Sequence, residues 1–210
     1  MPKFSGKKIL PSVVEVPTVY ETPTVYEMGA GGGGGGGETV EIGGIKYNVI
    51  SIGNQKWLDR NLYLTWAGLT INPNTDTSSA FGAYRNLDYK CSVGMAYNKA
   101  AIEYLVNHPE LLNGFKVPTE SDLDNLISFG GDSSLLCNDV WGGNDEFGFN
   151  LKPSGIFQSY NNTWVSTTVA HLATSHYSSD FLYIKDIDIG TYHQQALQKY
   201  DASCVRLIKA

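Results

Sequence analysis

The sequence predicts an α+β domain with two helices and mostly antiparallel strands, preceded by an extended segment and a polyglycine linker. Three observations lead to this prediction. Two stretches in the first half of the globular region have apolar residues at helical spacing. Short strand-like runs fill the second half, and helices followed by strands are typical of an α+β fold. A run of glycines separates residues 1–28 from the rest of the chain.

The N-terminal part contains a tandem repeat, Val-Pro-Thr-Val-Tyr-Glu at 16–21 followed by Thr-Pro-Thr-Val-Tyr-Glu at 22–27. Proline in each copy opposes a helix and favours extended backbone. We therefore expect an extended anchor over residues 1–28 that lies along another protein as an added strand. Residues 29–37, which include seven consecutive glycines, read as a flexible linker. The globular domain is expected over 38–210.

The elements of the globular domain follow in order. Residues 38–42 and 45–50 predict a hairpin around Gly43–Gly44. Residues 97–105 predict a helix that ends near His108–Pro109. Thr119, with Asp122 three residues on, predicts the cap of a second helix that stops at Gly130–Gly131. Later strands are expected at 147–151, 155–158, 164–168, 181–189 and 203–209.

Composition excludes several classes of protein. The 210 residues contain 15 basic and 21 acidic side chains, a formal net charge of −6, and three arginines, which opposes a nucleic-acid-binding surface. No run approaches the length of a membrane span, and the N-terminus lacks the apolar core of a secretory signal, so we expect no membrane insertion. The three cysteines, Cys91, Cys137 and Cys204, are expected to be buried reduced thiols.

Several blocks of sequence then appear in the order of a known family. Residues 52–62, Ile-Gly-Asn-Gln-Lys-Trp-Leu-Asp-Arg-Asn-Leu, resemble the opening motif of the Fibrobacter succinogenes major paralogous domain. Further blocks are similar to that family's later motifs: Gly82–Tyr84, Tyr97–Ala101, Val117–Leu123, Asn144–Gly155, Trp164–Thr168 and Ser203–Lys209. The chain departs from the family at Leu123 and Val165, and residues 106–114 resemble an insertion.

The resemblance covers about residues 38–209 and implies a C-type-lectin-like fold. Relatives of that family occur in surface proteins of bacteria and in phage fibres. Within its motifs, five side chains are expected to pack in the core: Trp57, Phe147, Phe149, Trp164 and Arg206. The loops between the motifs are then expected to be displayed.

Catalytic and metal-binding patterns are weak. His171 and His176 lie five residues apart with no nearby cysteine, which gives little support for zinc. Ser166 lacks the surroundings of a nucleophile elbow, so we expect no catalytic residues. Calcium remains an open alternative at Asn138–Asp139 and 141–145, where oxygen ligands gather, although the same residue types also make turns. We expect no cofactor and no resident metal.

The leading interpretation is a non-enzymatic phage virion protein, a head fibre or capsid-decorating fibre. It assembles in the host cytoplasm and is attached through residues 1–28 to a capsid or other virion protein. Seven consecutive glycines favour a homotrimer, because glycine strands can pack around one axis. Aromatic and amide side chains in the loops suit host-surface glycans: Trp141, Tyr160, Asn161, Asn162, His176, Tyr177, Tyr192 and His193. The alternative is a bacterial cell-surface or outer-membrane-associated adhesion protein that binds carbohydrate.

Overall fold

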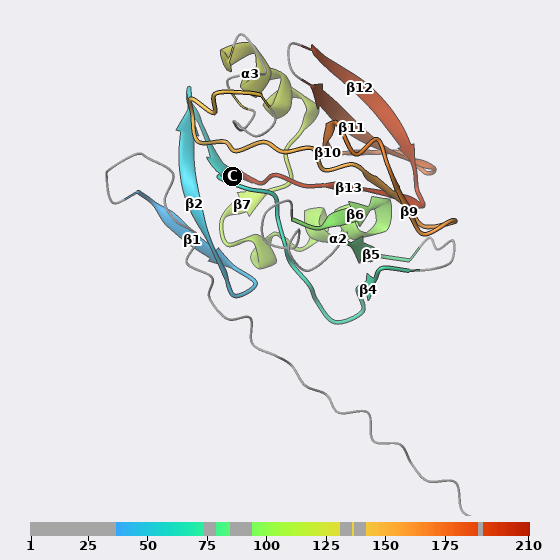
Figure 1. The fold of residues 1–210 in the computed structure, drawn as a ribbon. Coiled ribbons are helices and arrows are strands. Elements are labelled where there is room, and N and C mark those ends of the chain that lie inside the picture. The colour runs from blue at the N-terminus through green and yellow to red at the C-terminus, as the bar shows by residue number, and fades with distance from the viewer. Residues whose placement is uncertain (1–36, 74–78, 85–93, 131–135, 137–141, 189–190) are drawn as a thin grey trace, which may run out of the picture. The chain divides into compact units, whose positions relative to one another are not determined.

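A computed structural model of the chain describes residues 37–73, 79–84, 94–130, 136, 142–188 and 191–210. Contacts within the chain divide it between Gly33 and Gly34, inside the glycine run. The proposed anchor lies outside the described residues, as do Trp141, Cys91, Cys137 and Asn138–Asp139. The described part is mostly β-sheet with two α-helices, and is therefore an α+β domain (Figure 1).

The first sheet is antiparallel and joins the beginning and the end of the domain. Its strand order is β1–β2–β3–β14–β7. The strands are β1 (Thr39–Ile42), β2 (Ile45–Ile52), β3 (Gln55–Leu58), β14 (Ile208–Lys209) and β7 (Phe115–Lys116). Gly43 and Gly44 both have positive φ, which the tight β1–β2 turn requires. The predicted hairpin around this turn is therefore present.

The second sheet is larger and curls into a half-barrel (Figure 1). Its main path is β12–β11–β10–β13–β6–β5–β4, with β8 paired to β13 and β9 paired to β8. The strands are β4 (Thr70–Ile71), β5 (Phe81–Ala83), β6 (Ala96–Asn98), β8 (Ile156–Gln158), β9 (Thr163–Val165), β10 (Ala170–Tyr177), β11 (Phe181–Asp188), β12 (Thr191–Gln198) and β13 (Asp201–Cys204). The β10–β13 and β4–β5 pairs are parallel, and the others are antiparallel.

Side-chain caps begin both helices. The side chain of Asn98 accepts a hydrogen bond from the Ala101 amide at the start of α2 (Lys99–Asn107). A short 3-10 helix, Pro109–Leu112, follows it. At α3 (Glu120–Gly130), Thr119 and Asp122 form a reciprocal pair: the Thr119 amide donates to Asp122, and the Asp122 amide donates to the Thr119 hydroxyl.

A buried joint connects the two sheets through the chain between β13 and β14. Arg206 is 1% exposed and donates to Asn61 Oδ1 and to the carbonyl oxygens of Leu58 and Phe149. Its guanidinium also lies 4.3 Å from the centre of the Phe149 ring. Trp57 is fully buried against the same ring, edge to face at 5.8 Å. Burial lowers the Arg206 pKa to about 10, so the side chain stays charged at neutral pH.

The structure corrects three predicted strands. Residues 147–151 form a turn with only a bridge at Leu151, because Gly148 and Asn150 both have positive φ. The strand at 164–168 ends at Val165, since Ser166 is also left-handed. The single strand expected at 203–209 is two strands in different sheets, β13 and β14. Two eight-residue strands, β10 and β12, lie where none was predicted.

The aromatic side chains of the family-like motifs do not share one environment. Trp57 and Phe149 are fully buried, as expected of core residues. Trp164 and Phe147 are only half-buried and pack at the margins of two hydrophobic clusters. Cys204 is buried and in no disulfide with a described residue, and burial raises its pKa to about 12, which agrees with a reduced packing role.

Candidate functional site

The candidate site is built on β10, β11 and β12 together with the first turn of α3. These three strands form an antiparallel meander that ends the second sheet. The register puts Leu172, Lys185 and Gln194 directly opposite one another across the strands, so they share one face. Helix α3 covers this face, because Lys185 contacts Asp124 at 2.7 Å and Leu172 packs in the same cluster as Leu123.

Four side chains form a polar cluster at the start of α3. The carboxylate of Glu120 contacts His176 Nδ1 at 2.8 Å and accepts a hydrogen bond from Gln194 Nε2 at 2.7 Å. The His176 ring stacks on Tyr183 with 4.2 Å between ring centres. Glu120 comes from the helix and the other three residues from three successive strands. We call these residues the Glu120 cluster.

The Glu120 cluster is accessible yet well supported. The His176 side chain is 55% exposed and that of Glu120 is 28% exposed. Beneath it lies Lys185, whose side chain is only 7% exposed. Lys185 forms an ion pair with Asp124, one turn along the helix from Glu120. Both contacts between Glu120 and the sheet go to the same oxygen, Oε1. The cluster can therefore offer carboxylate, imidazole and amide groups to a hydroxyl-bearing ligand beside an aromatic ring.

The other face of the meander carries a second histidine–carboxylate pair. His171, Asp186 and His193 lie directly opposite one another on successive strands. His171 Nδ1 contacts Asp186 at 2.6 Å, and its Nε2 lies 3.2 Å from the carbonyl oxygen of Ser166. His171 is 2% exposed.

Together with Ser166, His171 and Asp186 have the residue types of a catalytic triad but not its arrangement. In a Ser–His–Asp triad the serine hydroxyl faces the imidazole. Here the backbone carbonyl of Ser166 occupies that place, at a residue whose φ is +51°. The contacts of His171 therefore fasten the turn after β9 to the sheet and indicate a structural role.

The structure divides the predicted ligand-binding residues into separate places. His176 belongs to the Glu120 cluster, while Tyr192 and His193 lie on β12 beside Gln194. Tyr177 packs against the core and lies under the Lys99 ammonium at 5.1 Å. Tyr160, Asn161 and Asn162 form the β8–β9 turn. Trp141 lies outside the described residues.

The backbone of the β8–β9 turn accounts for the two asparagines found there. Asn162 has φ of +52° and its amide donates to the Ser159 carbonyl at 3.4 Å. Asn161 accepts a hydrogen bond from Thr163 through its backbone carbonyl. These asparagines therefore make the turn, as their residue type favours. Only Tyr160, 61% exposed, presents a large side chain to solvent there.

Sequence reasoning missed Glu120, Tyr183 and Gln194. They are 11 to 74 residues apart along the chain, and no local motif joins them. Only the meander register and the position of α3 bring them together. Asp122 gave a partial signal, because its pairing with Thr119 predicted where the helix begins and hence where Glu120 lies.

Metal ligands do not gather in the part of the chain that the structure describes: no group of three or more His, Cys, Asp or Glu side chains there could hold an ion. Of the residues considered for calcium, Asp145 instead accepts a hydrogen bond from the Asn150 amide at 2.6 Å and caps a turn. Across the described ranges, every helix is too short or too polar to cross a membrane.

Comparison with known proteins gives no relative for this chain: no family model, no curated protein and no solved structure matches it. The residues of the chain and their geometry therefore carry the functional argument.

Proposed function

We propose that this chain is a non-enzymatic virion protein of a phage, a head fibre or capsid-decorating fibre that displays a lectin-like head. Residues 38–210 would be the head, 29–37 the spacer and 1–28 the anchor to a capsid or other virion protein. Support comes from the sequence blocks that resemble a C-type-lectin-like family and from the α+β architecture, in which two small helices accompany two mostly antiparallel sheets.

The ligand we propose is a host-surface glycan bound at the Glu120 cluster. The observation that carries this proposal is the exposed arrangement of Glu120, His176 and Gln194 on one face of a supported sheet. Sugar hydroxyls both donate and accept hydrogen bonds, and this cluster supplies both kinds of partner. Tyr192, 51% exposed and two residues before Gln194 on β12, adds an aromatic surface on which a pyranose ring can stack.

Binding does not require calcium in this proposal. Asp145 is engaged in its own turn, and the Glu120 cluster contains a single carboxylate. A hard cation prefers six to eight oxygen ligands, which that cluster does not supply. Glycan binding should therefore be the same in excess EDTA.

A glycan array probed with the full-length chain tests the ligand proposal. We expect binding to a discrete set of glycans that is lost in Glu120→Gln and His176→Ala. Asp180→Asn is the matched control, because it changes an exposed, ion-paired carboxylate on the same meander, outside the cluster. An array without signal, or equal signal from all variants, would contradict the ligand proposal.

The anchor is tested separately on assembled particles. Deletion of residues 1–28 should leave a folded protein that binds the same glycans but is missing from purified virions. Particles that still carry the truncated protein would refute the anchor. Recovery of the native chain from a bacterial surface, and not from particles, would favour the adhesion alternative.

The glycine run also supports a homotrimer in this proposal, since three glycine strands can approach one axis without side chains between them. Light scattering on the full chain and on a variant lacking residues 1–37 separates this from a monomeric head. The full chain should have a mass divisible by three protomers, and the truncated chain should not keep the threefold association.

A further inference from the structure

Glu120 differs from the two other carboxylates on helix α3 in how its charge is balanced. Asp122 and Asp124 each contact a lysine ammonium, at 3.1 Å and 2.7 Å. Glu120 instead contacts His176 and Gln194, and no lysine or arginine in the described part of the chain pairs with it. A carboxylate without a permanent cation therefore remains at the surface, with 28% of its side chain exposed.

The hydrogen bonds inside the Glu120 cluster determine what the cluster has left for a ligand. A carboxylate only accepts hydrogen bonds, so His176 must donate to Glu120 from Nδ1 and Gln194 must donate from Nε2. A neutral imidazole that donates from Nδ1 is an acceptor at Nε2. The atoms not used within the cluster are then three acceptors, Glu120 Oε2, His176 Nε2 and Gln194 Oε1, and one donor, the second amide hydrogen of Gln194.

The surroundings of the cluster supply no competing cation. In α3 and the three strands of the meander, Lys185 is the single lysine or arginine. Its ammonium contacts Asp124, and only 7% of its side chain is exposed. The aromatic ring of Tyr192, 51% exposed on β12, also attracts positive charge to its face. Excess of acceptors, uncompensated negative charge and an exposed ring together favour a cationic ligand.

Building on the glycan site proposed above, we infer that the Glu120 cluster selects an amino sugar whose amino group is not acetylated. As an ammonium this group has three donors and no acceptor, which complements the acceptor atoms of the cluster. The adjacent carboxylate of Glu120 also favours the charged form of the amine. In an N-acetylated sugar the charge is absent, and the acetyl carbonyl adds an acceptor where the cluster already has several.

The exposed ring beside the cluster favours a sugar over a lysine side chain of a protein. Tyr192 lies two residues before Gln194 on β12, so both side chains leave the same face of the strand. A pyranose can place an apolar face on that ring while its amine meets the carboxylate of Glu120. A lysine side chain has the same ammonium but no ring to stack.

The test compares two oligosaccharides of equal length, one of glucosamine and one of N-acetylglucosamine, by calorimetric titration of the full-length chain at about 0.15 M ionic strength. We expect the glucosamine oligomer to bind at least roughly fivefold more tightly, which is the scale of one exposed ion pair. A lysine-rich peptide titrated under the same conditions measures how much of the binding needs only an ammonium.

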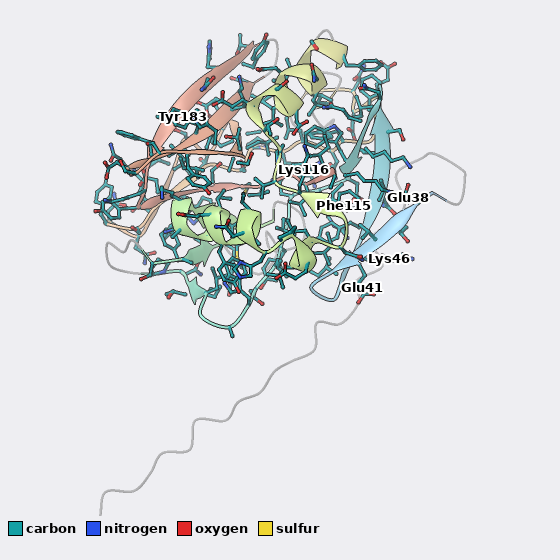
Figure 2. The ribbon with its side chains drawn as sticks, turned by 180° about the vertical axis from the view of Figure 1, so that it is seen from behind. Glu38, Glu41, Lys46, Phe115, Lys116 and Tyr183 are labelled. Atoms are coloured by element: carbon teal, nitrogen blue, oxygen red, sulfur yellow. The ribbon has the colours of Figure 1, made fainter. Side chains whose placement is uncertain are left out.

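Two variants remove one negative charge each. Glu120→Gln should weaken binding of the glucosamine oligomer at least roughly fivefold and keep the melting temperature within roughly 2 °C of wild type. Glu41→Gln is the matched control: it changes an exposed carboxylate on β1, which Figure 2 shows on the opposite side of the domain from Tyr183. Because that charge is distant and screened, affinity should stay within about twofold of wild type.

The outcomes separate this inference from the proposed function. Equal or tighter binding of the N-acetylglucosamine oligomer overturns the amino-sugar inference alone, since glycan binding itself would stand. Absence of binding to every glycan contradicts the proposed function and this inference with it. Equal losses in Glu120→Gln and Glu41→Gln would assign the attraction to the net charge of the chain. A lysine-rich peptide that binds as tightly as the glucosamine oligomer, and equally needs Glu120, would make the ligand a protein.

Discussion

The buried joint around Arg206 and the meander β10–β12, whose last strand is exposed, are built in opposite ways. At the joint, Arg206, Trp57 and Phe149 are almost fully excluded from solvent, and the guanidinium bonds to backbone and side-chain acceptors from distant parts of the chain. In the meander, β12 is exposed along nearly its whole length. Figures 1 and 2 show β12 and Tyr183 of β11 on the side away from β1. The difference separates the residues that carry stability from those that we propose for recognition.

The largest change in the free energy of unfolding is expected at the buried joint. Trp57→Ala should lower the free energy of unfolding by roughly 3–5 kcal/mol, because it empties a fully enclosed site. Trp164→Ala is the matched comparison, and its half-buried ring should cost at least about 1 kcal/mol less. Urea unfolding of both variants measures the difference. Equal losses would mean that burial does not set the contribution of these rings.

A second effect follows from the polar half of the joint. Arg206→Met keeps much of the apolar stem but leaves the carbonyls of Leu58 and Phe149 and the side chain of Asn61 without this donor. Each buried acceptor left unsatisfied costs about 1–3 kcal/mol, so we expect a loss of roughly 2–4 kcal/mol after partial relaxation. The same urea experiment detects it. A loss below about 1 kcal/mol would show that the charge is not needed to join the sheets.

The meander should respond weakly in stability to the changes that matter for binding. His176→Ala and Glu120→Gln should each cost only about 0–1 kcal/mol, since the His176 side chain is more than half exposed. Thermal unfolding measures this. A loss as large as that of Trp57→Ala would erase the contrast between the two regions.

The smallest change in stability is expected from Glu38, at the start of the globular part. Hydrogen bonds from Lys209 and then Lys56 lower the Glu38 pKa from 4.5 to about 2. A carboxyl whose pKa is lowered on folding adds stability above pH 4.5 and loses it as the pH falls through about 2. The difference in melting temperature between wild type and Glu38→Gln should therefore shrink over this range. It should also be reduced in about 1 M salt, because Glu38 is exposed. A difference that is constant with pH would contradict this origin.

The sequence predicted the parts of the fold that rely on local chemistry. The two glycines at 43–44 specified the first turn, and the Thr119–Asp122 pair specified where α3 begins. The single predicted strand at 203–209 failed because Arg206 lies at the crossing between two sheets, and no local pattern marks that change.

The missing strands have a physical explanation. Strand predictions rely on alternation of apolar and polar residues. In β10 the first five residues are all buried, and in β12 nearly all are exposed, so neither strand alternates. The predicted site included His176, Tyr192 and His193 because of residue type. Glu120 and Gln194, 74 residues apart, needed the tertiary structure.

Hydrogen–deuterium exchange of the full-length chain, with and without a glycan selected on the array, tests the central claim most directly. The account predicts that bound glycan protects amides at 119–124, 170–177 and 191–198, while exchange around Arg206 stays unchanged. Protection confined to the β8–β9 turn at Tyr160–Asn162, or to the first sheet, would contradict the assignment of recognition to the meander.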